Sequence, residues 1–87
     1  MWISGEKQLT GVLMKYSMHW DEQSQLYRIQ AWRDIPRHGV LKGDWGGLVS
    51  GEHNLSHYYD CWITHGARVT GSGRLMQNAI VTGNSEV

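Results

Sequence analysis

Three side chains of the types that bind metals or catalyse reactions lie close together in the sequence. His57, Cys61 and His65 follow one another at a spacing of four residues. On a helix this spacing would place a thiolate and two imidazoles on one stripe, and these are ligands that zinc prefers. In the six-residue pattern described below, Cys61 occupies an inward position and His65 an outward bend, so the three side chains would diverge. We therefore expect no metal site and no cofactor.

Other candidates for catalysis are weak. No serine lies in a G-x-S-x-G elbow, the turn that exposes a nucleophilic serine in many hydrolases. Asp21 and Glu22 are adjacent carboxylates in a polar stretch, where solvent exposure is expected rather than an acid–base pair. The glycines between Gly39 and Gly51 have neither the Walker-A lysine spacing nor a G-x-G-x-x-G before a helix, so they do not predict a phosphate site. We expect that the protein is not an enzyme.

The composition sets wider limits. The chain has 87 residues, with 8 Lys and Arg against 8 Asp and Glu and a formal net charge of zero, which suits one domain over 1–87. Proteins that bind nucleic acids or anionic membranes non-specifically normally carry a basic excess, so neither partner is expected. The single cysteine cannot form an intrachain disulfide, no apolar run approaches a membrane span of about 20 residues, and the first residues lack the pattern of a signal peptide. We expect a cytoplasmic protein.

Residues 1–36 predict a β-hairpin that caps the rest of the chain. Between 12 and 20 apolar and polar side chains alternate with period two, which is the pattern of a half-buried strand. A polar stretch over 21–25 suits a turn, and a second strand is expected over 26–35. The alternative is a helix over 23–32. We assign Trp20 and Trp32 to the core and Lys15 to the face opposite Tyr16. Residues 1–10 are either a short edge strand or a loose arm.

Residues 37–60 are expected to form a glycine-rich bridge that leads into the first coil of a repeat. Pro36 ends the second strand, because it restricts the conformation of Ile35. Gly46 and Gly47 permit left-handed backbone or a close approach of another segment.

The C-terminal part, 61–87, carries a six-residue repeat. An aliphatic residue occupies every sixth position and a small residue stands two positions before each, which gives Ile63, Val69, Leu75, Val81 and Val87 after Cys61, Ala67, Gly73, Ala79 and Ser85. Five consecutive hexads in register indicate an internal repeat. The aliphatic side chains are expected to point inward and stack on their equivalents one coil away, while the small residues occupy crowded corners. Successive coils would pair their backbones in parallel.

This pattern resembles the hexapeptide-repeat proteins, whose fold is a left-handed parallel β-helix with three hexads in each coil. The blocks L-Y-R-I-Q-A-W-R-D, V-L-K-G-D-W-G-G-L-V, N-L-S-H and D-C-W-I, in this order before the repeats, are similar to small phage- and prophage-encoded β-helix proteins. The resemblance covers about residues 26–87. It implies that Val49 and Leu55 begin the coil and that 57–60 are an insertion that shifts the register by two.

The expected fold class is therefore all-β, with an N-terminal hairpin followed by a short hexapeptide-repeat β-helix. The expected function is non-enzymatic protein binding or self-assembly in the cytoplasm of a bacterial host. One version is a homo-oligomer formed through the last coil; the other, which the resemblance implies, is a phage-type inhibitor of a host protein, for example a defence complex. The alternative is a small-ligand or metal binder, or an acyltransferase-like remnant, that uses His57, Cys61 and His65.

Aromatic and arginine side chains are the main candidates for a protein interface, since such residues dominate binding hot spots. Trp62 lies between two inward residues, so we expect it to face outward beneath the hairpin or a partner. The residues assigned to the interface are Trp45, Tyr58, Tyr59, Trp62, Arg68, Arg74 and Val87.

Overall fold

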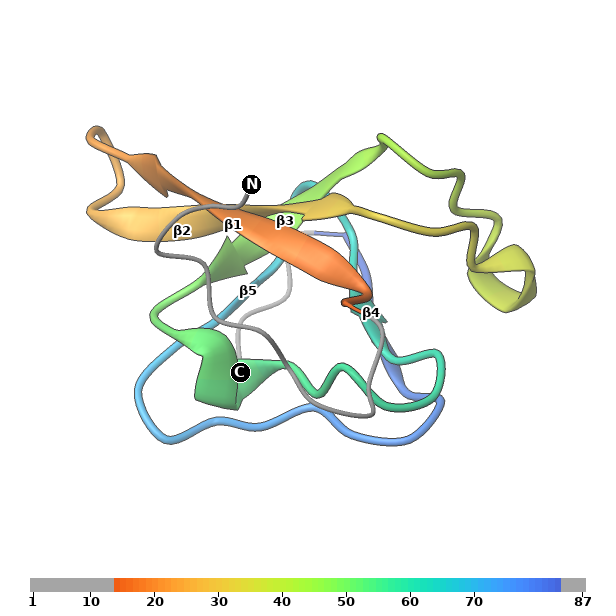
Figure 1. The fold of residues 1–87 in the computed structure, drawn as a ribbon. Coiled ribbons are helices and arrows are strands. Elements are labelled where there is room, and N and C mark those ends of the chain that lie inside the picture. The colour runs from red at the N-terminus through yellow and green to blue at the C-terminus, as the bar shows by residue number, and fades with distance from the viewer. Residues whose placement is uncertain (1–13, 84–87) are drawn as a thin grey trace.

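The computed structural model describes residues 14–83. This range contains six strands and two short 3-10 helices, joined by turns and loops (Figure 1). The strands are β1 (Tyr16–Asp21), β2 (Leu26–Ala31), β3 (Trp45–Val49), β4 (Trp62–Ile63), β5 (Arg68–Val69) and β6 (Ile80–Val81), and the 3-10 helices are η1 (Pro36–His38) and η2 (Glu52–Asn54). This range contains no α-helix, so the expected all-β class is confirmed for it. It also contains no helix that is long and apolar enough to cross a membrane.

The N-terminal hairpin is confirmed. β1 runs antiparallel to β2, with Tyr16 opposite Ala31. The turn closes where the backbone N–H of Gln25 donates to the carbonyl oxygen of Asp21 at 2.8 Å. The alternative of a helix over 23–32 is wrong, because the first residues of this range form the turn and 26–31 pair with β1. The second strand is shorter than expected: it ends at Ala31, and Ile35 forms only an isolated bridge with Val40.

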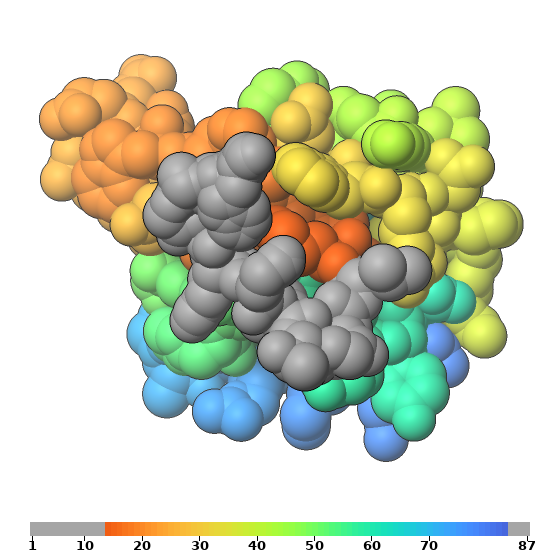
Figure 2. Space-filling model, viewed as in Figure 1, coloured from red at the N-terminus to blue at the C-terminus, as the bar shows by residue number. Residues whose placement is uncertain are grey.

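The assignment of Trp20 and Trp32 to the core is wrong. These side chains are 51% and 52% exposed. The tip of the hairpin projects beyond the body of the molecule (Figure 2), so no second layer lies beneath Trp20, which instead packs edge-on against Tyr27 with ring centroids 5.1 Å apart. Trp32 follows the end of β2. The core side of the hairpin is filled by Tyr16 and Ile29, both fully buried.

Parallel pairings join two successive stretches of the C-terminal part. The main sheet has the order β1-β2-β3-β5, in which β3 is antiparallel to β2 and parallel to β5. Further along the chain Leu55 bridges Leu75 in parallel, and β4 pairs in parallel with β6. The segment 48–63 therefore meets the segment 68–81 at three places in the same order. Beyond β3 and β5, the two segments leave the main sheet, and the part around η2 lies below it in Figure 1.

The six-residue pattern correctly predicts the buried positions. Every aliphatic position of the count that falls within residues 49–81 is buried: Val49, Leu55, Ile63, Val69, Leu75 and Val81. Of the small positions, Cys61 and Ala67 are buried as expected, but the expectation is wrong for Ala79, which is exposed. The expectations for residues 1–10, Ser85 and Val87 lie outside the described residues.

The glycine pair in β3 lies where backbone segments approach closely. A Cβ atom at Gly46 would lie 2.7 Å from the Trp62 ring and the Ile63 carbonyl oxygen, and one at Gly47 would lie 2.4 Å from the carbonyl oxygen of Ala67. Distances this short are steric overlaps. The close approach expected of this pair is thus confirmed.

Candidate functional site

The segment 56–61, here called the tyrosine loop, connects the end of the second 3-10 helix to β4. It carries the two most exposed aromatic side chains of the described residues, Tyr58 at 61% and Tyr59 at 68%. Tyr59 also has a φ of 61°, in the left-handed region that a bulky non-glycine residue rarely adopts. Such strain persists only where the surroundings fix the backbone, and it is concentrated at functional sites.

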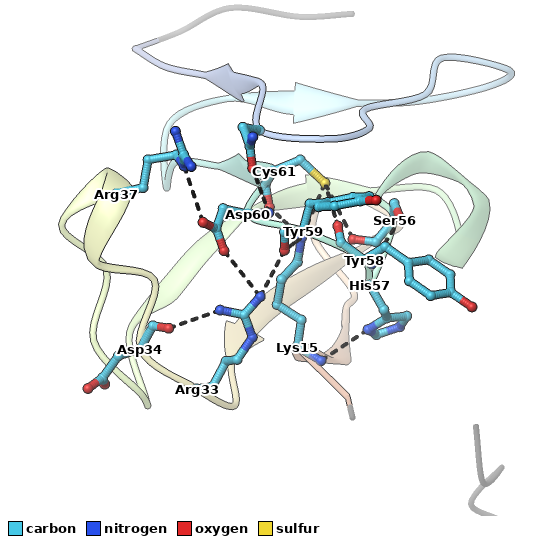
Figure 3. A network of polar contacts seen from close by, with 11 residues as sticks. Lys15, Arg33, Asp34, Arg37, Ser56, His57, Tyr58, Tyr59, Asp60 and Cys61 are labelled. Carbon is cyan, nitrogen blue, oxygen red and sulfur yellow. Dashed lines mark hydrogen bonds and ion pairs between the residues drawn. The ribbon is translucent and has the colours of Figure 1, made fainter. Parts of the chain in front are cut away.

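Hydrogen bonds from distant parts of the chain fix the tyrosine loop (Figure 3). From below, Lys15 Nζ donates to the carbonyl oxygen of Cys61 at 2.7 Å and, more weakly, to that of Tyr59 at 3.4 Å. Arg33 Nη2 donates to the same Tyr59 oxygen at 2.8 Å. The backbone N–H of Asp60 donates to Asn78 Oδ1 at 3.2 Å. The unusual conformation of Tyr59 is therefore held by the hairpin on one side and by the last parallel segment on the other.

Two arginines bind Asp60, the residue that follows the two tyrosines. Asp60 accepts from Arg33 Nη2 at 3.3 Å and from Arg37 Nε at 3.2 Å, and both guanidinium groups remain at least one third exposed. The hydrogen bond from Arg37, helped by Arg33, holds the pKa of Asp60 below its usual value. The carboxylate thus orients two cations beside the backbone of the tyrosine loop, next to the peptide of Tyr59. We call these four residues, Arg33, Arg37, Tyr58 and Tyr59, the tyrosine–arginine patch.

Lys15 and Cys61 form a buried pair beneath the tyrosine loop. Lys15 has no solvent exposure, and its Nζ lies 3.2 Å from Cys61 Sγ. Burial lowers the pKa of Lys15, although the contact with Cys61 opposes this effect. The sulfur also faces the carbonyl oxygens of Ser56 at 3.4 Å and Leu75 at 3.6 Å. The assignment of Lys15 to the face opposite Tyr16 is wrong, because both side chains point into the body.

His57 is held in one neutral tautomer. Its Nδ1 accepts the backbone N–H of Lys15 at 3.2 Å, so the proton must lie on Nε2, which faces Glu52 Oε2 at 2.9 Å. The ring stacks on Tyr16 with centroids 4.1 Å apart. Burial lowers the pKa of His57 below 6.5, although Glu52 favours the charged form. Protonation of Nδ1 would place its N–H against the backbone N–H of Lys15, so that two donors would face each other.

We expect His57 to make the folded state less stable in acid. Its folded-state pKa is below the value of 6.5 for the unfolded chain, so the unfolded state binds more protons as pH falls. The contribution of His57 to the free energy of unfolding is therefore complete above about pH 6.5. It is lost progressively as the pH falls from there through the folded-state pKa. Urea unfolding between pH 7.5 and 5 should show this decrease. His57→Gln should flatten it, whereas the same change at exposed His65 should not; equal slopes in all three proteins would contradict the assignment.

The structure does not gather His57, Cys61 and His65 into one site. Residues 57–65 form a loop and a two-residue strand, so the helical stripe does not exist. Both ring nitrogens of His57 have other partners, Cys61 Sγ contacts Lys15, and His65 is exposed. Between residues 14 and 83 no group of three or more His, Cys, Asp or Glu side chains could hold a metal ion.

The other residues assigned to an interface are scattered. Trp45 is exposed at the start of β3 and contacts the ring of His19 edge-on at 5.0 Å, while Arg68 and Arg74 are exposed elsewhere. Trp62 is covered, as expected, but by β3: it is only 2% exposed, because glycine in β3 leaves room for the indole, and it is therefore not accessible to a partner. Val87 lies outside the described residues. Of the residues of this candidate site, the sequence singled out Tyr58 and Tyr59 but not Lys15, Arg33 or Arg37, for which no local signal exists.

Comparison of the chain with protein-family models, curated proteins and solved structures gives no match in any of the three. The function is therefore argued below from the contacts of the site.

Proposed function

We propose that this chain is a non-enzymatic protein-binding module and that the tyrosine–arginine patch is its contact surface. The observation that carries the proposal is Tyr59, which is 68% exposed although its left-handed backbone is fixed by Lys15 and Arg33. These hydrogen bonds hold the strained backbone of Tyr59, but its side chain remains in solvent. Packing of the core therefore does not explain why this conformation is maintained. Tyrosine and arginine are the residue types that contribute most to protein interfaces, and a loop that is already ordered loses little entropy on binding.

The scaffold in this proposal is a short β-helix of the hexapeptide type. The parallel pairings of Val49 with Val69 and of Ile63 with Val81, with the Leu55 bridge between them, support two stacked coils. The tyrosine loop coincides with the insertion at 57–60 that interrupts the six-residue count. In repeat proteins, insertions form loops on one face, and that face is often the binding face. A host protein is the partner that the resemblance to phage-encoded proteins suggests.

A double variant, Tyr58→Ser/Tyr59→Ser, tests this surface. Immobilised wild-type chain is incubated with bacterial lysate, and the bound proteins are identified and then measured singly by titration. We expect the variant to bind such a partner at least about tenfold more weakly, because each tyrosine removed from a hot spot costs on the order of 1–2 kcal/mol. Its thermal melt should resemble that of the wild type, since both side chains are exposed.

The matched control is Trp20→Ser/Leu41→Ser, which removes two exposed apolar side chains outside the patch. Binding that survives the tyrosine variant, or that both variants abolish equally, would contradict the assignment of the patch. Light scattering over a range of concentrations decides whether the partner is a second copy of the chain. The observation that favours such self-association is an exposed apolar edge: Met76 lies shortly before β6 and Ile80 within it, and β6 has one neighbouring strand among residues 14–83.

A further inference from the structure

A primary amine and a thiol face each other in the interior. Lys15 Nζ and Cys61 Sγ are 3.2 Å apart, and neither residue has any solvent exposure. The amine also donates to the Cys61 carbonyl oxygen at 2.7 Å, which holds it beside the sulfur. Both groups are nucleophiles, so they do not react with each other until one of them is oxidised.

We propose that Lys15 and Cys61 form an oxidative covalent cross-link when the folded protein meets hydrogen peroxide. The cross-link is a sulfenamide, a bond between Nζ and Sγ. It joins the hairpin to the tyrosine loop across 46 residues of sequence. The pair is thus a modification site at which peroxide fixes the loop to the rest of the molecule.

The reaction balances in two steps. Peroxide oxidises the thiol by two electrons to a sulfenic acid and is itself reduced, with release of one water. The lone pair of Nζ then attacks sulfur; the N–S bond forms, the S–O bond breaks, and the departing hydroxide takes a proton from nitrogen as a second water. The product keeps one N–H, which still donates to the Cys61 carbonyl oxygen. One peroxide is consumed for each cross-link.

Three features of the site favour this outcome over further oxidation of sulfur. The chain has one cysteine, so the sulfenic acid has no second thiol within the protein, which is its usual reaction partner. Burial lowers the pKa of Lys15 and so increases the fraction of neutral, nucleophilic amine. The amine is already within hydrogen-bond distance of the sulfur. Peroxide is nearly as small as water, so it needs only local opening to enter.

Mass spectrometry of the folded full chain after peroxide treatment tests the proposal. Peroxide also adds about 16 Da to each methionine that it oxidises, and the chain has four. Beyond those additions we expect the intact mass to be about 2 Da lower, and a dithiol reductant to restore these 2 Da. A tryptic map should show loss of cleavage after Lys15 and a peptide that links residues 15 and 61. The denaturant midpoint should rise, because the cross-link restricts the unfolded chain. A gain of about 14 Da on the same linked peptide, from a second peroxide that inserts oxygen between nitrogen and sulfur, would support the same pair.

Matched variants identify the two atoms. Lys15→Met, which keeps the length of the side chain, and Cys61→Ala should each abolish the cross-link, whereas Lys42→Met at an exposed position should keep it. Wild-type chain oxidised in denaturant should gain oxygen on sulfur, because the amine is no longer held nearby. Folded wild type that keeps its mass apart from oxidised methionines, or that gains about 32 Da on Cys61 without linkage, overturns the proposal, and this result does not depend on how the variants fold. Binding by the tyrosine–arginine patch is a separate measurement.

Discussion

Val69→Asp should abolish the cooperative thermal melt of the chain. Val69 lies in β5, has no solvent exposure and pairs with Val49, which is equally buried. The substitution removes apolar burial and places a carboxyl group where no partner is available, at a combined cost on the order of 5 kcal/mol. Small domains have a total stability of about 5–15 kcal/mol. Circular dichroism during heating would show a lost or strongly lowered transition.

Thr82→Asp is the control for this substitution. Thr82 directly follows buried Val81 but is itself exposed, so the same carboxyl group remains in water and the stability should change by less than about 0.5 kcal/mol. A wild-type melt for Val69→Asp would mean that the six-residue register does not define the core. The pair of variants therefore tests the pattern on which the parallel pairing depends.

Periodic patterns predicted the parts of the fold that local geometry decides. Alternation over 12–20 predicted β1, because successive side chains of a strand point to opposite faces. The six-residue count predicted the buried aliphatic positions from Val49 to Val81, because parallel pairing places aliphatic positions of the count side by side. The coarse class and the hairpin followed from these two periods alone.

Burial that depends on a second layer was not predictable in the same way. The alternation correctly placed Trp20 on the same face of the hairpin as buried Tyr16. The body of the protein, however, does not extend beneath the hairpin tip, so Trp20 is exposed. Trp62 is buried because Gly46, distant in sequence, leaves space for its ring. The parity of a strand specifies a face of the sheet; it contains no information on what covers that face.

The site was predictable only in its exposed part. Tyr58 and Tyr59 stand out in the sequence as adjacent aromatics within an insertion. Their anchors come from far away: Arg33 is 26 residues from Tyr59, and Lys15 is 46 residues from Cys61. Lys15 occupies a polar position of an alternating segment, which normally means solvent exposure. Its burial results from carbonyl oxygens of the loop that gather only in the folded chain.

These anchors make the hairpin and the tyrosine loop depend on each other. Lys15 directly precedes β1 and Arg33 lies shortly after β2, and both donate to the carbonyl oxygen of Tyr59. A shift of the hairpin relative to β4 would break these bonds and release the strained backbone. The hairpin is therefore part of the proposed binding site as well as a cover for the core, and changes at the contact between the sheet and the segment 62–67 should affect both stability and binding.

Gly47→Ala is the second substitution for which we expect a large effect. A Cβ atom at Gly47 would lie 2.4 Å from the carbonyl oxygen of Ala67 and 2.6 Å from that of Thr64. These are backbone atoms, so relief of the overlap requires β3 to move away from 64–67, although the Leu48 amide donates to the same Ala67 oxygen at 3.1 Å. Overpacking of this kind costs about 3 kcal/mol or more, which urea unfolding would measure.

Gly39→Ala separates this steric effect from backbone strain. Gly39 has a φ of 70° and open space around the position of a Cβ atom, so only the left-handed conformation is penalised, by about 1–2 kcal/mol. An equal loss of stability in both variants would argue against the close approach of β3 to 64–67. The segment that the new methyl group at Gly47 would displace directly follows β4, and β4 follows the tyrosine loop. We therefore expect Gly47→Ala to lose more stability than Gly39→Ala. If it also binds more weakly at a temperature where both variants are folded, the sheet positions the tyrosine loop.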